Sequence, residues 1–150
     1  MKPLQFYAVT KSGSVYRINA VPEAGDLPEV RKIYIRTGQD SKVASGEPLS
    51  DEPGNKFFIT QGDGLLFAHI SPNRPRELPN INYYRANSSP IVALFMTEGG
   101  ATRCAESEDL EGWDERWADS STAVLEAIGP EYPSIVLGPR LPYGPRLSPV

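Results

Sequence analysis

Runs of apolar residues separated by polar and glycine-rich segments divide the chain into short elements. The longest uninterrupted apolar run is Ile91–Met96, with Ser-Ser-Pro before it and Glu-Gly-Gly soon after it. A continuous apolar run of this length between turn residues is typical of a strand buried on both faces. We therefore predict that residues 91–96 form the central strand of a sheet.

Two pairs of apolar runs flank glycine-containing turns. Phe6–Thr10 and Val15–Ile18 lie on either side of Lys-Ser-Gly-Ser, and Phe57–Thr60 and Leu65–Ile70 lie on either side of Gln-Gly-Asp-Gly. Strand-forming residues around such turns predict two β-hairpins. The second hairpin echoes the first, which indicates either an internal duplication or, more simply, the residue types that every hairpin selects.

Three other segments have strand patterns. Residues 30–36 alternate, with Ile33 and Ile35 on one side and Lys32, Tyr34 and Arg36 on the other, which predicts a strand with one solvated face. Residues 81–85 and 134–137 predict two short strands. The long polar segment 37–55 predicts a functional or mobile loop, which could include a short strand at 42–44.

The apolar period changes to a helical one after the predicted central strand. Residues 101–107 place Ala101, Cys104 and Ala105 on one face, which favours a short helix. A second helix is predicted to follow an Asp114 N-cap and to end at Gly129-Pro130. Its apolar stripe consists of Trp117, Val124, Leu125 and Ile128. We expect this helix to cross one face of the sheet, anchored by Trp113 and Trp117.

These elements predict an α+β fold for residues 1–137. We expect an antiparallel, β-rich sheet or half-open barrel of about six to seven strands, with one or two helices near the C-terminus packed on one face. Residues 138–150 are rich in proline and glycine and predict an extended tail. The chain is thus expected to be one domain followed by that tail.

Composition limits the classes of protein to consider. The 150 residues are 39% hydrophobic and 23% charged, which is ordinary for a globular protein. No apolar run is long enough to cross a membrane, and the first residues do not form a signal peptide. A single cysteine excludes an internal disulfide framework. We therefore expect a soluble protein in the cytoplasm.

Charge is unevenly distributed along the chain. The net charge is −4, and eight acids between Glu98 and Asp119 face only Arg103 and Arg116. The first part of the chain and the tail are richer in Lys and Arg. Such asymmetry can orient a partner, although solvated faces of a sheet and a helix are the commoner cause.

No residue set predicts a catalytic centre. His69 is the only histidine and Cys104 the only cysteine, so the usual zinc ligands are missing. Acids near Cys104 would raise its pKa, and we interpret it as a buried helical thiol. Asp63 and the two glycine turns lack the spacing of a phosphate-binding loop. The sequence predicts no cofactor and no metal, and it favours a non-enzymatic role.

Aromatic and basic residues alternate along the predicted strands. The aromatics are Tyr7, Tyr16, Tyr34, Phe57, Phe67, Tyr83 and Tyr84, and the bases are Lys11, Arg17, Lys32, Arg36 and Arg85. A sheet with both kinds of side chain on its surface could stack single-stranded bases. The negative net charge and the usual place of strand aromatics in the core make this a secondary hypothesis.

The tail is the one segment whose pattern predicts binding. Its Pro-x-x-Pro spacings are typical of polyproline II ligands, which lose little entropy when they dock in an aromatic groove. The predicted partner-binding residues are Pro139, Arg140, Leu141, Pro142, Tyr143, Pro145 and Arg146. We therefore expect a small interaction or assembly module that meets a protein partner, or another copy of itself, through this tail and the loop 37–55. The alternative is a ligand-binding protein or hydrolase-like enzyme with a cleft near His69.

Overall fold

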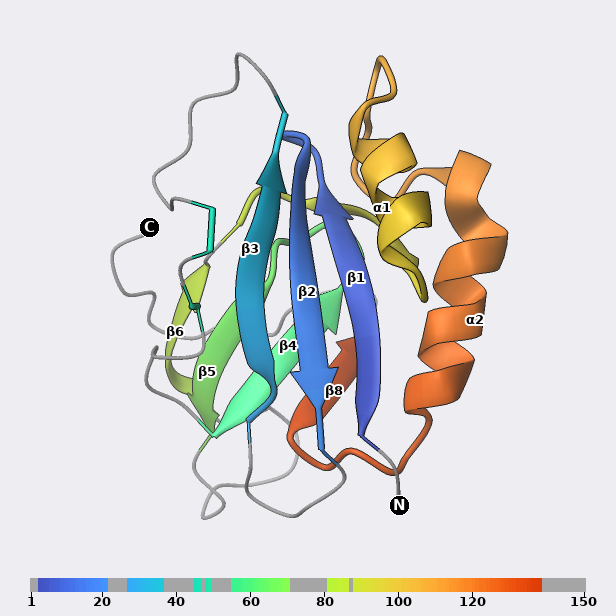
Figure 1. The fold of residues 1–150 in the computed structure, drawn as a ribbon. Helices are drawn as coiled ribbons and strands as arrows, with labels where there is room; N and C mark the ends of the chain where they lie inside the picture. The colour runs from blue at the N-terminus through green and yellow to red at the C-terminus, as the bar shows by residue number, and fades with distance from the viewer. Residues whose placement is uncertain are drawn as a thin grey trace.

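A computed structural model describes residues 3–21, 27–36, 45–46, 48–49, 55–70, 81–86 and 88–138 (Figure 1). The fold is α+β, as predicted, with strands throughout and two α-helices in the later part of the chain. The strands are β1 (Leu4–Thr10), β2 (Ser14–Ala20), β3 (Glu29–Ile35), β4 (Lys56–Thr60), β5 (Leu66–Ile70), β6 (Ile81–Ala86), β7 (Ile91–Phe95) and β8 (Ile135–Gly138). The helices are α1 (Glu98–Ala105), the 3-10 turn η1 (Glu115–Trp117) and α2 (Ala118–Ile128).

The strands form two four-stranded sheets with related connections. The first sheet has the order β3-β2-β1-β7, and the second has the order β6-β5-β4-β8. Each consists of an antiparallel three-strand meander with a later strand beside the first strand of the meander. The added strand β7 is antiparallel to β1, whereas β8 is parallel to β4. Both predicted hairpins are confirmed, and the echo between them extends to the plan of the two sheets.

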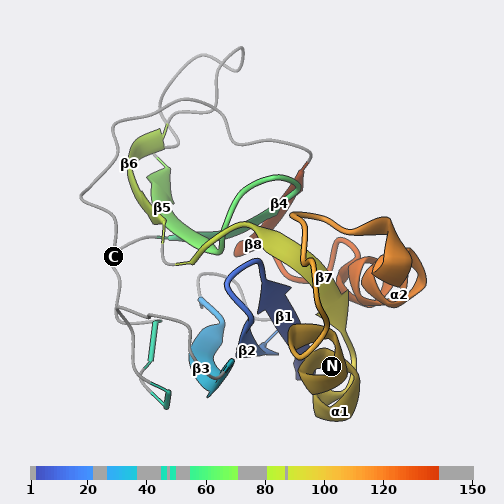
Figure 2. The ribbon, with the colours of Figure 1, turned by 90° about the horizontal axis from the view of Figure 1, so that it is seen from above.

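The two sheets pack face to face, with α1 outside one of them. Viewed from above, the β1-containing sheet lies between the β4-containing sheet and α1, and α2 runs beside β7 (Figure 2). The inner faces of both sheets and α2 share one apolar cluster, which includes Phe6, Ile18, Phe57, Phe67, Leu94, Val124 and Ile128. A second cluster joins the outer face to α1 and includes Tyr7, Val9, Val15, Ala93, Ala101 and Cys104. Helix α2 therefore flanks the sheets rather than crossing one face.

The apolar run at 91–96 forms an edge strand, not the predicted central one. Residues 91–95 are buried on both faces, as expected, because α2 and the second sheet cover one face and α1 covers the other. The outer edge of β7 is closed by backbone bonds from Trp113 N to Ile91 O (2.6 Å) and from Asp114 N to Val92 O (2.8 Å). Continuous burial therefore arose from layers above and below the strand, without a strand on each side.

Strand β3 corrects the predicted alternation of residues 30–36. The pairing of β2 with β3 passes from Val15↔Tyr34 to Tyr16↔Lys32, which leaves Ile33 as an extra residue. Lys32 faces inward with Val30, two residues earlier, and it is only 3% exposed and lies 5.7 Å from the centre of the Tyr16 ring. The bulge instead moves Tyr34 to the outer cluster. Lys32 was therefore wrongly placed on the solvated face.

Part of the segment 37–55 is anchored to the sheet. Gly46 N donates to Lys32 O, and Leu49 N donates to Val30 O (2.7 Å), so these residues cover the outer edge of β3. Leu49 is buried in the inner cluster. The suggested strand at 42–44 lies outside the described residues.

The helices begin at different residues from those predicted. Helix α1 starts at Glu98 and includes both Gly99 and Gly100, since the side chain of Thr97 accepts from Gly100 N (3.2 Å) as its N-cap. Asp114 caps the 3-10 turn η1, and α2 follows directly from it. Within the described part of the chain, no helix combines the length and the apolar character that membrane crossing requires.

Candidate functional site: a groove beside Trp113

Trp113 holds an unusual backbone conformation between β7 and α2. Its φ angle is 53°, in the left-handed region that large side chains rarely adopt. Such a conformation costs about 1 to 3 kcal/mol and persists only where the surroundings enforce it. Here the bonds from Trp113 N and Asp114 N to β7 enforce it. Holding this residue in place therefore lowers the stability of the folded protein.

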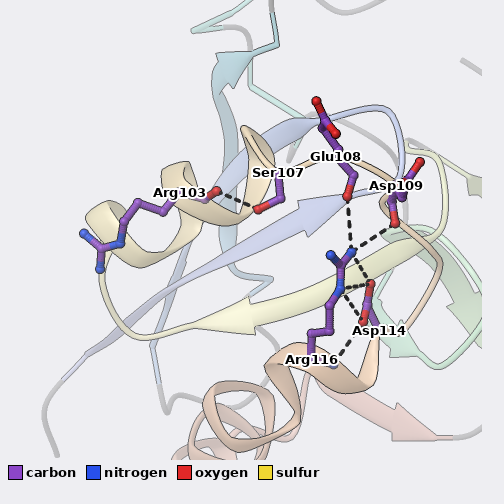
Figure 3. A network of polar contacts seen from close by, with 6 residues as sticks. All are labelled: Arg103, Ser107, Glu108, Asp109, Asp114 and Arg116. Carbon is purple, nitrogen blue, oxygen red and sulfur yellow. Dashed lines mark hydrogen bonds and ion pairs between the residues drawn. The ribbon is translucent and has the colours of Figure 1, made fainter.

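Arg116 fixes the turn that follows Trp113. The guanidinium bonds Asp114 through Nη2 to Oδ2 (2.7 Å) and Nε to Oδ2 (3.0 Å), and Nη2 also donates to the carbonyl of Asp109 (3.0 Å), as Figure 3 shows. The guanidinium also stacks 4.4 Å from the ring centre of Trp117. Hydrogen bonds from Arg116 hold the pKa of Asp114 below its ordinary value. The turn is therefore bound together by one charged cluster.

Two hollows share Trp113 in their lining. Both are lined by Trp113 and by Gln61, the first residue of the β4–β5 turn. The first has a volume of about 290 Å³ and is otherwise lined by Ile59, Leu125, Leu137 and Gly138. The second has a volume of about 230 Å³ and is otherwise lined by Asp114, Glu115, Ala118, Ser121 and Thr122. We call these two hollows together the Trp113 groove; one half is apolar and the other is polar and acidic.

Strand β8 leads the chain directly to this groove. Gly138 is the last residue of β8 and lines the apolar hollow, and its carbonyl accepts from Gln61 N (3.0 Å). The predicted partner-binding residues 139–146 follow immediately in the sequence and lie outside the described residues. The predicted binding segment therefore starts beside a groove whose role the sequence did not reveal.

Cys104 lies inside the outer cluster, away from this groove. It is fully buried on the inner side of α1, between α1 and the β1-containing sheet. Burial, with the nearby Asp114 carboxylate as a smaller cause, raises its pKa from 9.0 to about 12. The thiol is thus protonated at neutral pH, which agrees with the interpretation of Cys104 as a small core residue.

The structure does not bring His69, Cys104 and Asp63 together. The backbone of His69 belongs to β5, in the sheet on the other side of β1 and β2 from α1, and its side chain lies outside the described residues. Asp63 belongs to the β4–β5 turn, where its side chain accepts from Thr60 Oγ1 (3.3 Å) and its carbonyl accepts from Ile91 N (3.0 Å). Asp63 thus links the turn to β7.

Most strand aromatics are core residues. Among the described side chains, Tyr7, Tyr16, Phe57 and Phe67 are buried, and the last two rings contact each other at 4.9 Å. Tyr34 is partly exposed. The side chains of Tyr83 and Tyr84 lie outside the described residues. The aromatic part of the predicted base-stacking surface is therefore largely unavailable to a ligand.

The residues that line the groove are mostly apolar in one hollow and mostly polar or acidic in the other. Among the residues that the structure describes, no three His, Cys, Asp or Glu side chains converge as a cation site. Trp113 and the aliphatic side chains offer apolar contact, and Glu115 and Gln61 offer charge and hydrogen bonds at the rim. This combination suits a segment of chain with apolar and basic residues.

Sequence reasoning missed the groove because its parts are distant in the chain. Trp113 was expected to anchor α2, and Gln61 was only a turn residue. The sole local signal was a tryptophan placed directly before the predicted N-cap at Asp114, outside the apolar stripe of the helix. Gln61 and Leu137 join it only through the pairing of β4 with β8.

Comparison with known proteins gives no match: no protein-family model, curated protein or solved structure corresponds to the chain. The function is therefore inferred from the groove and from the segment that follows it.

Proposed function

We propose that the protein is a non-enzymatic interaction module that binds a protein partner through its Pro-rich tail and its loop 37–55. The observation that supports this proposal is the position of Gly138, the last residue of β8, which lines the same hollow as Trp113 and directly precedes the tail in the sequence. Recognition between Pro-rich segments and aromatic grooves is a common mode of peptide binding.

The two alternatives have less support. An enzyme or ligand-binding protein centred on His69 would need groups from several elements around one cleft, whereas Cys104 and Asp63 serve the core and a turn. A single-stranded nucleic-acid protein would need exposed aromatics, and four of the candidate rings are buried. Binding that is absent, or insensitive to salt, would exclude this last alternative.

The test is quantitative capture of partners by variants of the full chain. One variant lacks residues 139–150, and a second lacks residues 38–44 but retains Gly46 and Leu49, because these residues pair with β3. Circular dichroism and thermal unfolding confirm that each variant is folded. We expect each deletion to reduce capture of the same partner. Unchanged capture by both variants and by their combination would refute the proposal.

A further inference from the structure

We propose that residues 139–146 dock in the Trp113 groove of the same molecule as a polyproline II segment. Three observations support this proposal. They are the residues that line the groove, the position of Gly138 in that lining and the spacing of the prolines that follow Gly138. The proposal goes beyond partner binding, because it concerns what fills the groove before a partner arrives.

The tail has a period of three. Its prolines occur at positions 139, 142 and 145. A polyproline II helix has three residues per turn, so these prolines fall on one side of it. The second side carries Arg140, Tyr143 and Arg146, and the third carries Leu141, Gly144 and Leu147. In this conformation the segment has two apolar sides and one basic side.

The groove complements these sides. Trp113, Leu125 and Leu137 form an apolar half against which prolines and leucines can pack. Asp114 and Glu115 line the other half. Since Asp114 already binds Arg116, the exposed Glu115 is the carboxylate that is placed to pair with an arginine of the tail.

Hydrogen-bond donors at the rim suit a polyproline II backbone. The carbonyls of such a segment make no internal hydrogen bonds. Gln61 and Trp113 line both hollows, and each side chain carries an N–H group of the kind that donates to such carbonyls. An aromatic ring with adjacent donors is the arrangement that orients a Pro-rich ligand.

The distance also favours docking within one molecule. Gly138 lines the apolar hollow, so the segment starts at the groove. Eight residues of polyproline II extend for about 25 Å, so the segment has length to follow the groove from Gly138. A segment tethered this closely has a high effective concentration, so weak contacts suffice to keep it bound.

The test is NMR of the full-length protein, in which each tryptophan gives its own indole N–H signal. We expect nuclear Overhauser effects between the Trp113 ring and protons of Pro139 or Pro142. Replacing the three prolines (Pro139→Ser, Pro142→Ser, Pro145→Ser) should shift the Trp113 signal, whereas Trp117, which packs in the outer cluster, serves as the internal reference. Absence of these effects together with an unshifted Trp113 signal would overturn the proposal.

A matched pair of charge changes tests the orientation of the segment. Glu115→Gln should lower the ratio of docked to undocked tail about two- to five-fold, the effect of losing one exposed ion pair. It should move the Trp113 signal toward its position in the proline-substituted protein. Glu126→Gln removes an exposed acid of α2 that does not line the groove, and should leave the signal in place. Equal shifts in both variants would overturn the predicted pairing.

Mixed samples of labelled and unlabelled protein separate the two sources of a docked tail. Overhauser effects that arise only between differently labelled molecules would show that a second copy supplies the tail, and would overturn docking within one molecule.

The experiments can refute the docking proposal and the partner-binding proposal independently of each other. Partner capture that depends on residues 139–150, without Trp113 contacts, would refute docking alone. Trp113 contacts, with capture unaffected by the deletions, would refute the proposed function alone.

Discussion

Asp114 uses one carboxylate to bind both the backbone and the side chain of Arg116. Its Oδ1 accepts from Arg116 N (2.9 Å) as the cap of η1, while Oδ2 binds the guanidinium. Both contacts lie next to Trp113, whose backbone is strained. The shape of the groove therefore depends on a charge that can be removed by protonation.

We expect Asp114→Asn to destabilise the protein at neutral pH while retaining the cap, since Asn can still accept from Arg116 N. The Asp114 pKa lies below 3.8 when the protein is folded, so its charge adds stability above about pH 4, which is lost as pH falls through the folded-state pKa. Urea unfolding at several pH values measures this. The difference in unfolding free energy between the unsubstituted protein and Asp114→Asn should disappear in acid. The control variant Glu126→Gln should show no such pH-dependent difference. A difference that is constant with pH would contradict the assignment.

For Cys104 we expect the opposite pH dependence, a loss of stability as pH rises. Because burial raises its pKa from 9.0 to about 12, the folded protein retains a proton that the unfolded chain loses. The stability associated with this thiol is complete below pH 9 and declines as pH rises from 9 toward 12. We expect Cys104→Ala to unfold at a urea midpoint that falls less steeply over this range. Parallel slopes for the two proteins would show that the thiol is not the group responsible.

Two glycines of one turn provide a matched pair. Gly62 has a φ of 85° and open space where a side chain would lie, so Gly62→Ala should cost only backbone strain, about 1 kcal/mol. A β-carbon at Gly64 would overlap the carbonyl oxygen of Ser88. We expect Gly64→Ala to cost about 3 kcal/mol or more, because backbone must move. Equal unfolding free energies in the two variants would refute this packing.

At the scale of elements, the most consequential one is β7. It is an edge strand, yet its open side is blocked by the segment that leads into α2. Edges of this kind otherwise invite pairing with another chain. Blocking also positions Trp113, because the same residues that close the edge form the groove.

Ser121 extends this closure from α2. Its buried hydroxyl oxygen accepts from Leu94 N (3.0 Å), which has no strand beside it on that side. Ser121→Ala leaves this amide without its acceptor, so we expect a loss of about 1 to 3 kcal/mol in unfolding free energy. The neighbouring exposed residue gives the control, since Thr122→Ala should change stability by less than about 0.5 kcal/mol. A Ser121→Ala variant as stable as the control would mean that water replaces the hydroxyl.

Elements governed by local pattern were predictable, and those governed by layering were not. The hairpins follow from turn residues between strand-forming runs, and α1 and α2 follow from apolar spacing. The position of β7 at an edge depends on which layers cover it, which a run of apolar residues cannot encode. The outward position of Tyr34, beside Ile33, depends on a bulge opposite Val15 and Tyr16 that the residue pattern of β3 does not reveal.

The candidate site also has one part that the sequence could predict and one that it could not. The Pro-rich segment 139–146 could be identified as a binding segment from its own residues, and this remains a prediction. The groove could not be identified, because Trp113, Gln61 and Leu137 meet only when β8 pairs with β4. The burial and raised pKa of Cys104 were predictable, since its acidic neighbours and apolar spacing already indicated a buried, protonated thiol.

At the scale of the whole molecule, β8 completes both the second sheet and the groove. Ile135 is buried in the inner cluster, and Gly138 accepts from Gln61 N. We expect a chain that ends at residue 138 to unfold within about 1 kcal/mol of the full-length protein, since it retains β8 and its pairing with β4. A chain that ends at residue 134 should lose about 3 kcal/mol or more, because apolar surface of β4 and β8 is no longer buried. Urea unfolding of both chains tests this, and equal stabilities would contradict it.

Because β4 pairs with β8, which is far later in the chain, the second sheet cannot be completed until late in synthesis. At about 5 to 20 residues per second, a ribosome exposes β4 for several seconds before β8 emerges. During this interval Phe57 and Ile59 lack the strand that later lies beside them. We expect nascent chains arrested before residue 135 to be cleaved readily by protease and to recruit chaperones, and chains arrested after residue 138 has left the exit tunnel to resist both.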